Sequence, residues 1–379
     1  MAVVTPASSR PGPAGRWNVL NGRHFYTSQA WLLAFSELAD MPAIRETRVA
    51  AAAVGHRAVT AQANPRYTHE WLYEDALRER VHEYGLLGGC AGYESHFPHV
   101  EDATPEDQRS TVEAVADKIG RAALLVAHVP TAEALHLVTH RILPGSAVPV
   151  LSMPVAELDL ADFGSFDDYV DSLSRNNRSG VRRDLRRADA SGLRTDIVPL
   201  RHVVDEVAPL LGQVQGHHGD NPDPAAAADY LRLCCHGGLA ESATAFVSRN
   251  SDGDAVAFAL GYPWHDTVFM RVAGMDYQRA TVSGAYFASY FYAPIRHALA
   301  TGRRLIDFGG ESLESKLRRG STLQPRWALS MGVAVDPAAA RAVSRRRVAH
   351  LIERGRGCSH WSGSSIEQWP SIHDRLSTG

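Results

Sequence analysis

One lysine follows a strand-like segment closely, at a place where an enzyme could use a positive charge. The chain has only two lysines, Lys118 and Lys316, and the rest of its 39 lysine and arginine residues are arginine. Lys316 comes shortly after residues 304–308, which predict a short buried strand, and after Gly309 and Gly310. Open α/β sheets bind ligands beyond their strand ends, and glycine lets a ligand approach the backbone. We therefore interpret Lys316 as a group that stabilises the oxyanion formed at an acyl carbon; the alternative is a solvent-exposed lysine near a helix start.

Polar residues around this turn could take part in the same chemistry. Glu311 and Glu314 are predicted to begin the helix that carries the lysine, where the first backbone amides could bind an anion or oxyanion. Asp307, near the strand end, is a candidate general base. His217, in the polar loop 215–221, is a second candidate because histidine titrates near neutral pH. No third ligand lies at a suitable spacing from that histidine, so the sequence predicts no metal site.

Aromatic side chains crowd the helix that precedes this strand. Tyr286 and Tyr290 lie four residues apart, hence on one helical face, and their hydroxyls could line an acceptor pocket. Packing against a sheet is the simpler explanation for Phe287 and Phe291. The candidate substrate-binding residues are Tyr286, Tyr290, Gly309, Gly310, Glu311 and Glu314.

Arginines form a basic helical face between residues 175 and 187. Four of them recur at i, i+3, i+7 and i+11, which places them on one side of a helix. Neighbouring positive charges repel unless an anion lies nearby, and guanidinium groups bind phosphate through paired hydrogen bonds. This predicts a phosphate track for tRNA or a nucleotide-bearing substrate, formed by Arg175, Arg178, Arg182, Arg183, Arg186, Arg318 and Arg319. A solvated helix face, paired with acids elsewhere, is an equally open alternative.

The length and the pattern of segments predict two domains. A chain of 379 residues is long for one hydrophobic core. Helical and strand-like segments alternate, which predicts an α/β layer architecture. We expect a disordered leader over residues 1–15, a first domain over 16–158, a second over 159–336, and a C-terminal helix and tail over 337–379. In the second domain, one long helix over 166–190 would carry the arginines.

The composition excludes several classes of protein. A net charge of −3 at pH 7 does not fit a uniformly basic protein that coats nucleic acid. No segment approaches the roughly 18 apolar residues of a membrane-spanning helix, and the N-terminal segment lacks the apolar core of a secretion signal. The four cysteines show no metal-binding spacing and no disulfide framework. We therefore expect a cytoplasmic protein.

The order of segments from residue 166 to residue 327 resembles the GNAT (N-acetyltransferase) fold, and more specifically the branch related to the FemAB peptidoglycan aminoacyltransferases. Two stretches carry the resemblance, LSRNNRSGVRRDLRRADASGL and YFASYFYAPIRHALATGRRLIDFGGESLESKLRRG. The resemblance implies tandem GNAT-like domains with mixed central sheets flanked by helices, the first domain being a degenerate copy. It also implies that Lys316 belongs to the active site. The sequence departs from the family pattern at two positions. Glu314 lies two residues before Lys316 instead of three, and Ala293 stands where several relatives carry an acid.

The loop 279–285 bears on the acyl donor. CoA-dependent members of the fold bind pyrophosphate with a Gln/Arg-x-x-Gly-x-Gly/Ala loop. Here Arg279 and Gly284 match, so Arg279 is a further phosphate-binding candidate, but Val282 replaces the middle glycine. A β-branched residue suits a positive φ poorly. We therefore favour aminoacyl-tRNA over acyl-CoA as the co-substrate, with no tightly bound cofactor.

These observations predict an acyltransferase that moves an aminoacyl group from aminoacyl-tRNA onto an amine or hydroxyl of a small-molecule or cell-wall-like acceptor. Two alternatives remain, an acyl-CoA-dependent N- or O-acetyltransferase and a non-catalytic RNA- or nucleotide-binding protein on a GNAT scaffold. The alanine- and arginine-rich composition is typical of a GC-rich bacterial source, where such enzymes often serve specialised metabolism. The sequence leaves the acceptor and the oligomeric state open.

Overall fold

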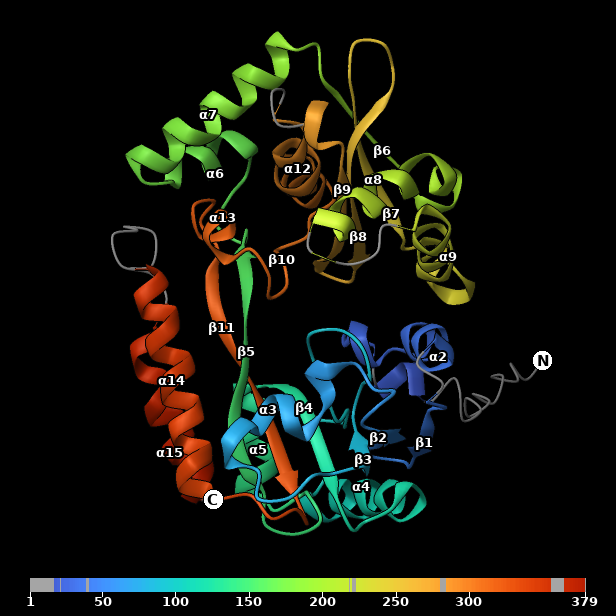
Figure 1. The fold of residues 1–379 in the computed structure, drawn as a ribbon, viewed down its shortest axis with the longest axis vertical. Helices are drawn as coiled ribbons and strands as arrows, with labels where there is room; N and C mark the ends of the chain where they lie inside the picture. The colour runs from blue at the N-terminus through green and yellow to red at the C-terminus, as the bar shows by residue number, and fades with distance from the viewer. Residues whose placement is uncertain are drawn as a thin grey trace, which may run out of the picture. The chain divides into compact units, whose positions relative to one another are not determined.

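The computed structural model describes residues 17–20, 22–38, 41–217, 219, 223–279, 284–355 and 365–378 (Figure 1). The leader expected over residues 1–15 lies outside these ranges. The chain forms two compact units. The first comprises the described residues up to Pro149 together with 328–340 and 375–378, and the second comprises 150–327 and 341–374. The units thus divide at Pro149/Val150, compared with the domain boundary expected at 158/159, and two later segments return to the first unit.

The first unit is built on a mixed sheet with the strand order β1-β2-β3-β4. The first two pairs of strands are antiparallel, and β3 pairs with β4 in parallel. Its strands are β1 (Ile44–Thr47), β2 (Ala52–Val59), β3 (Glu83–Leu87) and β4 (Leu124–Pro130). Its helices include α2 (Gln29–Leu38), α3 (His69–Tyr73), α4 (Pro105–Ile119) and α5 (Thr131–Thr139). Because α4 buries Val112, Val115 and Ala116, which share one helical face, it packs on the sheet through that face.

The second unit also has a mixed sheet, in the order β5-β10-β9-β8-β7-β6, with β11 beside β5. β10 pairs in parallel with β9, whereas the pairs β5–β10, β9–β8, β8–β7 and β7–β6 are antiparallel. The strands are β5 (Val148–Asp159), β6 (Arg194–Pro199), β7 (Thr244–Arg249), β8 (Ala255–Trp264), β9 (Thr267–Met275), β10 (Leu305–Asp307) and β11 (Thr322–Met331). The expected α/β fold class, with mixed sheets flanked by helices, is confirmed.

Helices connect the strands of the second unit and supply its candidate site residues (Figure 1). They are α6 (Phe166–Ser172), α7 (Arg175–Ala190), α8 (Val204–His217), α9 (Pro224–Cys234), α11 (Ala285–Phe287), the π-helix η6 (Ala288–Tyr292), α12 (Ala293–Ala300) and α13 (Leu313–Leu317). Two further helices follow β11, α14 (Pro337–Gly355) and α15 (Trp369–Thr378). The helix expected near residues 337–354 is therefore present.

The single helix expected over residues 166–190 is wrong. Leu173 and Ser174 have extended backbones, with ψ values of 150° and 153°, and they separate α6 from α7. Leu173 is buried, so its side chain packs inside the unit where the chain changes direction. The break lets α7 begin as a new helix with its own arginine-rich surface.

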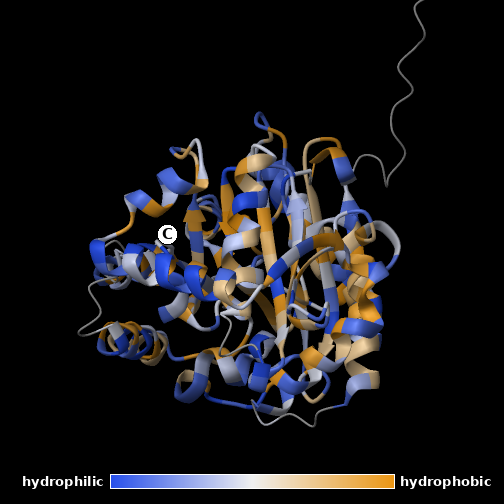
Figure 2. Cartoon of the chain, turned by 90° about the horizontal axis from the view of Figure 1, so that it is seen from above, coloured by the Kyte–Doolittle hydropathy of each residue, from blue (hydrophilic) through white to orange (hydrophobic). Residues whose placement is uncertain are grey.

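Apolar residues are prominent on the strands, whereas the helices carry both hydrophilic and apolar residues (Figure 2). In the second unit, Phe246, Phe258 and Tyr262 on β7 and β8 are fully buried. Burial of side chains this large supplies the main stabilisation of such a core. Among the residues that the structure describes, every helix is too short or too polar to cross a bilayer.

Candidate functional site

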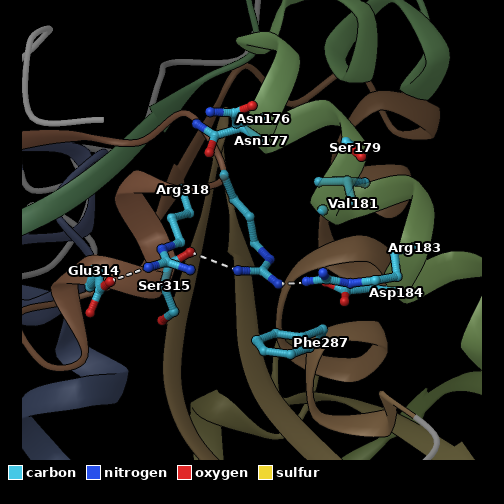
Figure 3. Close-up of a pocket in the computed structure, with 12 residues that line it drawn as sticks. Asn176, Asn177, Ser179, Val181, Arg183, Asp184, Phe287, Glu314, Ser315 and Arg318 are labelled. Atoms are coloured by element: carbon cyan, nitrogen blue, oxygen red, sulfur yellow. Dashed lines mark hydrogen bonds and ion pairs between the residues drawn. The ribbon is translucent and has the colours of Figure 1, made fainter. Parts of the chain in front are cut away.

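A cavity of about 580 Å³ lies at α7 and α13 within the second unit (Figure 3). One face of α7 forms one wall, the residues of and just after α13 form the other, and Phe287 of α11 adds an aromatic surface. Its volume suits a small molecule. The lining residues are Asn176, Asn177, Ser179, Gly180, Val181, Arg183, Asp184, Phe287, Glu314, Ser315, Arg318 and Arg319.

A buried ion pair joins the two walls. Arg319 donates from Nη2 to Oδ2 of Asp184 at 2.8 Å, and both side chains are less than 10% exposed. The hydroxyl of Tyr292 donates to the same carboxylate oxygen at 2.7 Å. The guanidinium lies over Phe287, with Cζ 4.0 Å from the ring centroid, and 4.6 Å from that of Phe291. These contacts fix Arg319 in one orientation, since a planar cation is held by a carboxylate and two aromatic faces.

A second ion pair in the cavity wall is much more open. Arg318 donates from Nη2 to Oε1 of Glu314, one helical turn away, and each side chain is 54% exposed. Figure 3 shows the two side chains facing each other beside Ser315. Because exposed pairs of this kind contribute little to stability, a ligand can separate them at small cost.

The predicted arginine face exists, but its members have different roles. Arg175, Arg182, Arg183 and Arg186 are exposed on α7, and Arg178 is half-buried. Asp171 of α6 accepts a hydrogen bond from Arg182 at 2.8 Å, and its backbone oxygen accepts one from Arg178 at 2.8 Å. Of these five arginines, Arg183 lines the cavity.

Lys316 is buried, with 2% of the residue exposed. Its Nζ donates to the carbonyl oxygen of Phe308 at 2.5 Å and to that of Gly309 at 3.1 Å. Burial lowers the pKa of Lys316 to about 7, against the opposing charges of Asp307 and Glu311. The amine therefore lies at the end of β10, as the sequence predicts for its position, but Lys316 is not among the residues that line the cavity.

The strand end itself is tightly organised. Asp307 is buried, and its Oδ1 accepts a hydrogen bond from the backbone N–H of Gly309 at 2.6 Å. Gly309 has a φ of +72°, which glycine adopts without strain. A Cβ on Gly310 would lie 2.1 Å from the flexible end of Met153 and 3.0 Å from the backbone oxygen of Pro154, so Gly310 packs closely against β5. Glu311, which precedes α13, is part of the same turn and raises the pKa of Lys316.

The two candidate tyrosines stack on each other, with ring centroids 5.5 Å apart and planes 8° apart. The hydroxyl of Tyr290 donates to the carbonyl oxygen of Phe308 at 2.9 Å. Tyr286 is half-buried, and burial raises the pKa of its hydroxyl to about 12. Neither tyrosine is among the cavity-lining residues. Sequence reasoning missed Phe287, whose type alone could not distinguish a cavity wall from core packing.

Two further candidates lie at the surface of the second unit. His217 is exposed at the end of α8, and its ring stacks on Tyr277 with centroids 4.4 Å apart. Arg279 forms ion pairs with Asp254 at 3.1 Å and Asp276 at 3.5 Å. Val282 and His218 lie outside the described residues. Among the residues described, no group of three or more histidine, cysteine, aspartate or glutamate side chains is arranged to hold a metal ion.

Comparisons with known proteins define the class of this fold. The structure of FemX matches with a TM-score of 0.61 at 9% identity, over 89% of this chain and 99% of FemX. A conserved protein of unknown function from Bacteroides thetaiotaomicron matches with a TM-score of 0.55 at 15% identity, over 84% of this chain and 97% of that one. The C-terminal domain of a protein described as a lysylphosphatidylglycerol synthetase, from Agrobacterium fabrum, matches with a TM-score of 0.52 at 13% identity, over 88% and 95%. No curated protein matches the chain by sequence.

The family model for FemAB-like proteins, described as peptidoglycan biosynthesis/recognition, matches residues 156–352. This match covers more than half of the chain, which therefore belongs to the FemAB-like family. The resemblance to FemAB-related, GNAT-like acyltransferases is confirmed, and the fold is that of an acyltransferase.

Proposed function

We propose that this protein is an aminoacyltransferase that moves an aminoacyl group from aminoacyl-tRNA to an amine or hydroxyl of a small-molecule or cell-wall-like acceptor. The observation that supports it best is the buried amine of Lys316 at the end of β10, in a chain of the FemAB-like family. A lysine is costly to bury, and buried ionisable groups with shifted pKa values are common at functional sites, which supports a chemical role for Lys316.

The reaction needs little more than positioning and charge. The acceptor nitrogen or oxygen attacks the ester carbon, and the carbonyl oxygen becomes an oxyanion. The carbonyl then re-forms, and the ribose oxygen of the tRNA leaves with the electrons of the broken C–O bond. The proton lost by the acceptor ends on that ribose oxygen. Because the ester is already activated, stabilising the oxyanion and holding the two substrates together supply most of the catalysis.

Lys316 suits the oxyanion role for an electrostatic reason. Two N–H groups of its ammonium are bound by Phe308 and Gly309, and the ammonium has a third donor. Burial lowers the pKa of Lys316 to about 7, so at neutral pH its charged and neutral forms are close in free energy. A negative charge that develops beside the amine favours the ammonium, and this preference lowers the barrier.

Asp307 and His217 are our candidates for the group that relays the acceptor proton. Asp307 is preferred because it is adjacent in sequence to Phe308, whose carbonyl oxygen binds Lys316. Its burial places it away from bulk water, whereas His217 is exposed on α8.

The donor RNA would lie along α7. Arg175, Arg182 and Arg186 are exposed on this helix and offer guanidinium groups for phosphates. An acyl-CoA donor is the second candidate. It is favoured by Gly284, which has a φ of +73° immediately before α11 and so matches the last glycine of a pyrophosphate loop.

The test is to incubate the protein with radiolabelled aminoacyl-tRNA or acetyl-CoA and a mixture of amine acceptors. Transfer of label from the aminoacyl-tRNA supports the proposal, and transfer from acetyl-CoA alone rejects it. Lys316→Met should abolish the transfer while the protein stays folded.

A further inference from the structure

We propose that the cavity between α7 and α13 binds a small zwitterion, a molecule that carries an ammonium and a carboxylate a few bonds apart. The first reason is the charge of its walls. Arg183, Arg318 and Glu314 line the cavity together, so it offers two cations and one carboxylate to a ligand. The other charged pair, Asp184 with Arg319, is buried, and its two charges are paired with each other.

The contrast between the two ion pairs shows which charges are available. The side chains of Asp184 and Arg319 are 9% and 7% exposed, and aromatic rings hold the guanidinium in place. This pair is part of the framework. Glu314 and Arg318 are each 54% exposed, and the ion pair between them spans one helical turn. A zwitterion replaces that pair with two new ones, its carboxylate on Arg318 and its ammonium on Glu314.

Glu314 also argues against a phosphate ligand in the same place. A phosphate group carries up to two negative charges near pH 7, and the carboxylate of Glu314 would repel it. The exposed arginines that suit phosphates, Arg175, Arg182 and Arg186, are not among the residues that line the cavity. Of the α7 arginines predicted to bind phosphate, Arg183 alone lines the cavity, so the cavity and the proposed RNA track overlap only there.

Neutral groups complete a polar surface of the right size. Asn176, Asn177 and Ser179 of α7 and Ser315 of α13 can donate and accept hydrogen bonds, and Phe287 covers one side. A Cβ on Gly180 would meet no atom within 4 Å, so this position in the wall faces open space. We assign the ligand to amino acids or short peptides. If the proposed function holds, this ligand is the acceptor of the transferred aminoacyl group, and that role rests on the proposed function.

Binding is measured without any acyl donor, so the result does not depend on the proposed reaction. Thermal unfolding of the full chain is followed with each of the twenty L-amino acids and alanyl-alanine. Each compound is paired with its N-acetyl form, which lacks the ammonium, and its amide, which lacks the carboxylate. Inorganic phosphate and AMP form a separate arm. We expect at least one zwitterion to raise Tm, with neither of its singly charged analogues doing so.

Variants then place the ligand in the cavity. Glu314→Gln and Arg318→Gln should each weaken calorimetric binding of that zwitterion by roughly ten- to a hundredfold, as expected for loss of a hydrogen bond to a charged group. Gly180→Leu should abolish binding, whereas Gly180→Ala and Arg194→Gln, the latter on β6, should keep it. The inference is overturned if no zwitterion binds, if the N-acetyl form binds equally well, if only phosphate or AMP binds, or if Glu314→Gln has no effect. If a zwitterion binds in the cavity but no aminoacyl group is transferred to it, the proposed function is rejected and the binding inference stands.

Discussion

Lys316 and Phe308 are joined by a hydrogen bond from Nζ to the carbonyl oxygen, with a donor–acceptor distance of 2.5 Å. The hydroxyl of Tyr290 donates to the same oxygen at 2.9 Å. This oxygen at the end of β10 therefore connects α13 and the π-helix η6 to the sheet. Since π-helical turns occur often at functional sites, the arrangement is consistent with a lysine that is positioned for chemistry.

The buried lysine should give the protein a characteristic pH dependence. The pKa of Lys316 falls from 10.5 to about 7 on folding, so the unfolded chain binds more protons than the folded chain between these values. The unfolding free energy of the wild type should therefore rise relative to that of Lys316→Met as pH increases from 7 toward 10.5. We expect a relative gain of roughly 2–4 kcal/mol over the full window.

Urea denaturation of the wild type and Lys316→Met at pH 7, 8 and 9 measures this difference in unfolding free energy. All other groups titrate in both proteins, so their contributions cancel in the difference. Parallel stability curves for the two proteins would show that Lys316 titrates normally and is not held in a buried position.

Removing Asp184 should be far more damaging than removing Glu314. Asp184→Ala leaves the guanidinium of Arg319 buried without its carboxylate, which costs roughly 3–5 kcal/mol. Glu314→Ala breaks only an exposed pair and should cost less than about 1 kcal/mol. The double variant Asp184→Leu/Arg319→Met should recover most of the loss, because it leaves no unpaired charge.

Denaturant titrations of the three variants provide the measurement. A small loss in Asp184→Ala, equal to that in Glu314→Ala, would contradict the view that this pair forms the framework of the cavity.

The first unit contains a histidine that should stabilise it below neutral pH. Burial acts to lower the pKa of His96, but the carboxylates of Glu133 and Glu94 outweigh it and raise the pKa to about 9. Nε2 of His96 lies 3.2 Å from Glu94, and Nδ1 lies 3.7 Å from Glu133. The folded protein thus binds a proton that the unfolded chain loses near pH 6.5. The contribution is full below pH 6.5 and is lost as pH rises through 9.

His24 stacks on His96 with ring centroids 3.9 Å apart and behaves in the opposite way. Burial lowers its pKa to about 4, so His24 reduces stability as pH falls from 6.5 to 4. The contribution of protonated His96 is lost over the higher range. The difference in unfolding free energy between the wild type and His96→Gln should therefore decline between pH 6.5 and 9. A constant difference across that range would rule out a protonated His96.

RNA binding should depend on salt through the arginines of α7. If Arg175, Arg182 and Arg186 each contact one phosphate, replacing any of them by glutamine should reduce the slope of log K against log salt by roughly 0.7–0.9. Filter binding of unfractionated tRNA at several salt concentrations measures the slope. Arg194→Gln is the control, since Arg194 is an exposed arginine of β6 outside this face. Equal slopes for the wild type and the α7 variants would reject the RNA track.

The sequence was sufficient for those features that depend on local pattern. The spacing of the arginines predicts one face of α7, and the glycine pair after an apolar run places Lys316 beyond a strand end. Contacts between distant segments were not predictable in the same way. Asp184 and Arg319 are 135 residues apart, and nothing local indicates that they share a buried ion pair.

Tertiary packing also decided details that the local sequence does not determine. The break at Leu173 and Ser174 arises because α6 and α7 pack separately, although helical propensity continues through the segment. The hydroxyl of Tyr290, a candidate for lining an acceptor pocket, donates to a backbone carbonyl in the described structure. Buried polar groups find partners inside the protein, and only the tertiary fold determines which ones.

The most direct measurement is transfer of a radiolabelled aminoacyl group from charged total tRNA, with the twenty amino acids and peptidoglycan-derived peptides as acceptors. We expect a labelled product that is lost after ribonuclease treatment of the tRNA, lost in Lys316→Met and retained in Arg194→Gln. A product formed equally by Lys316→Met, or formed only from labelled acetyl-CoA, would contradict it.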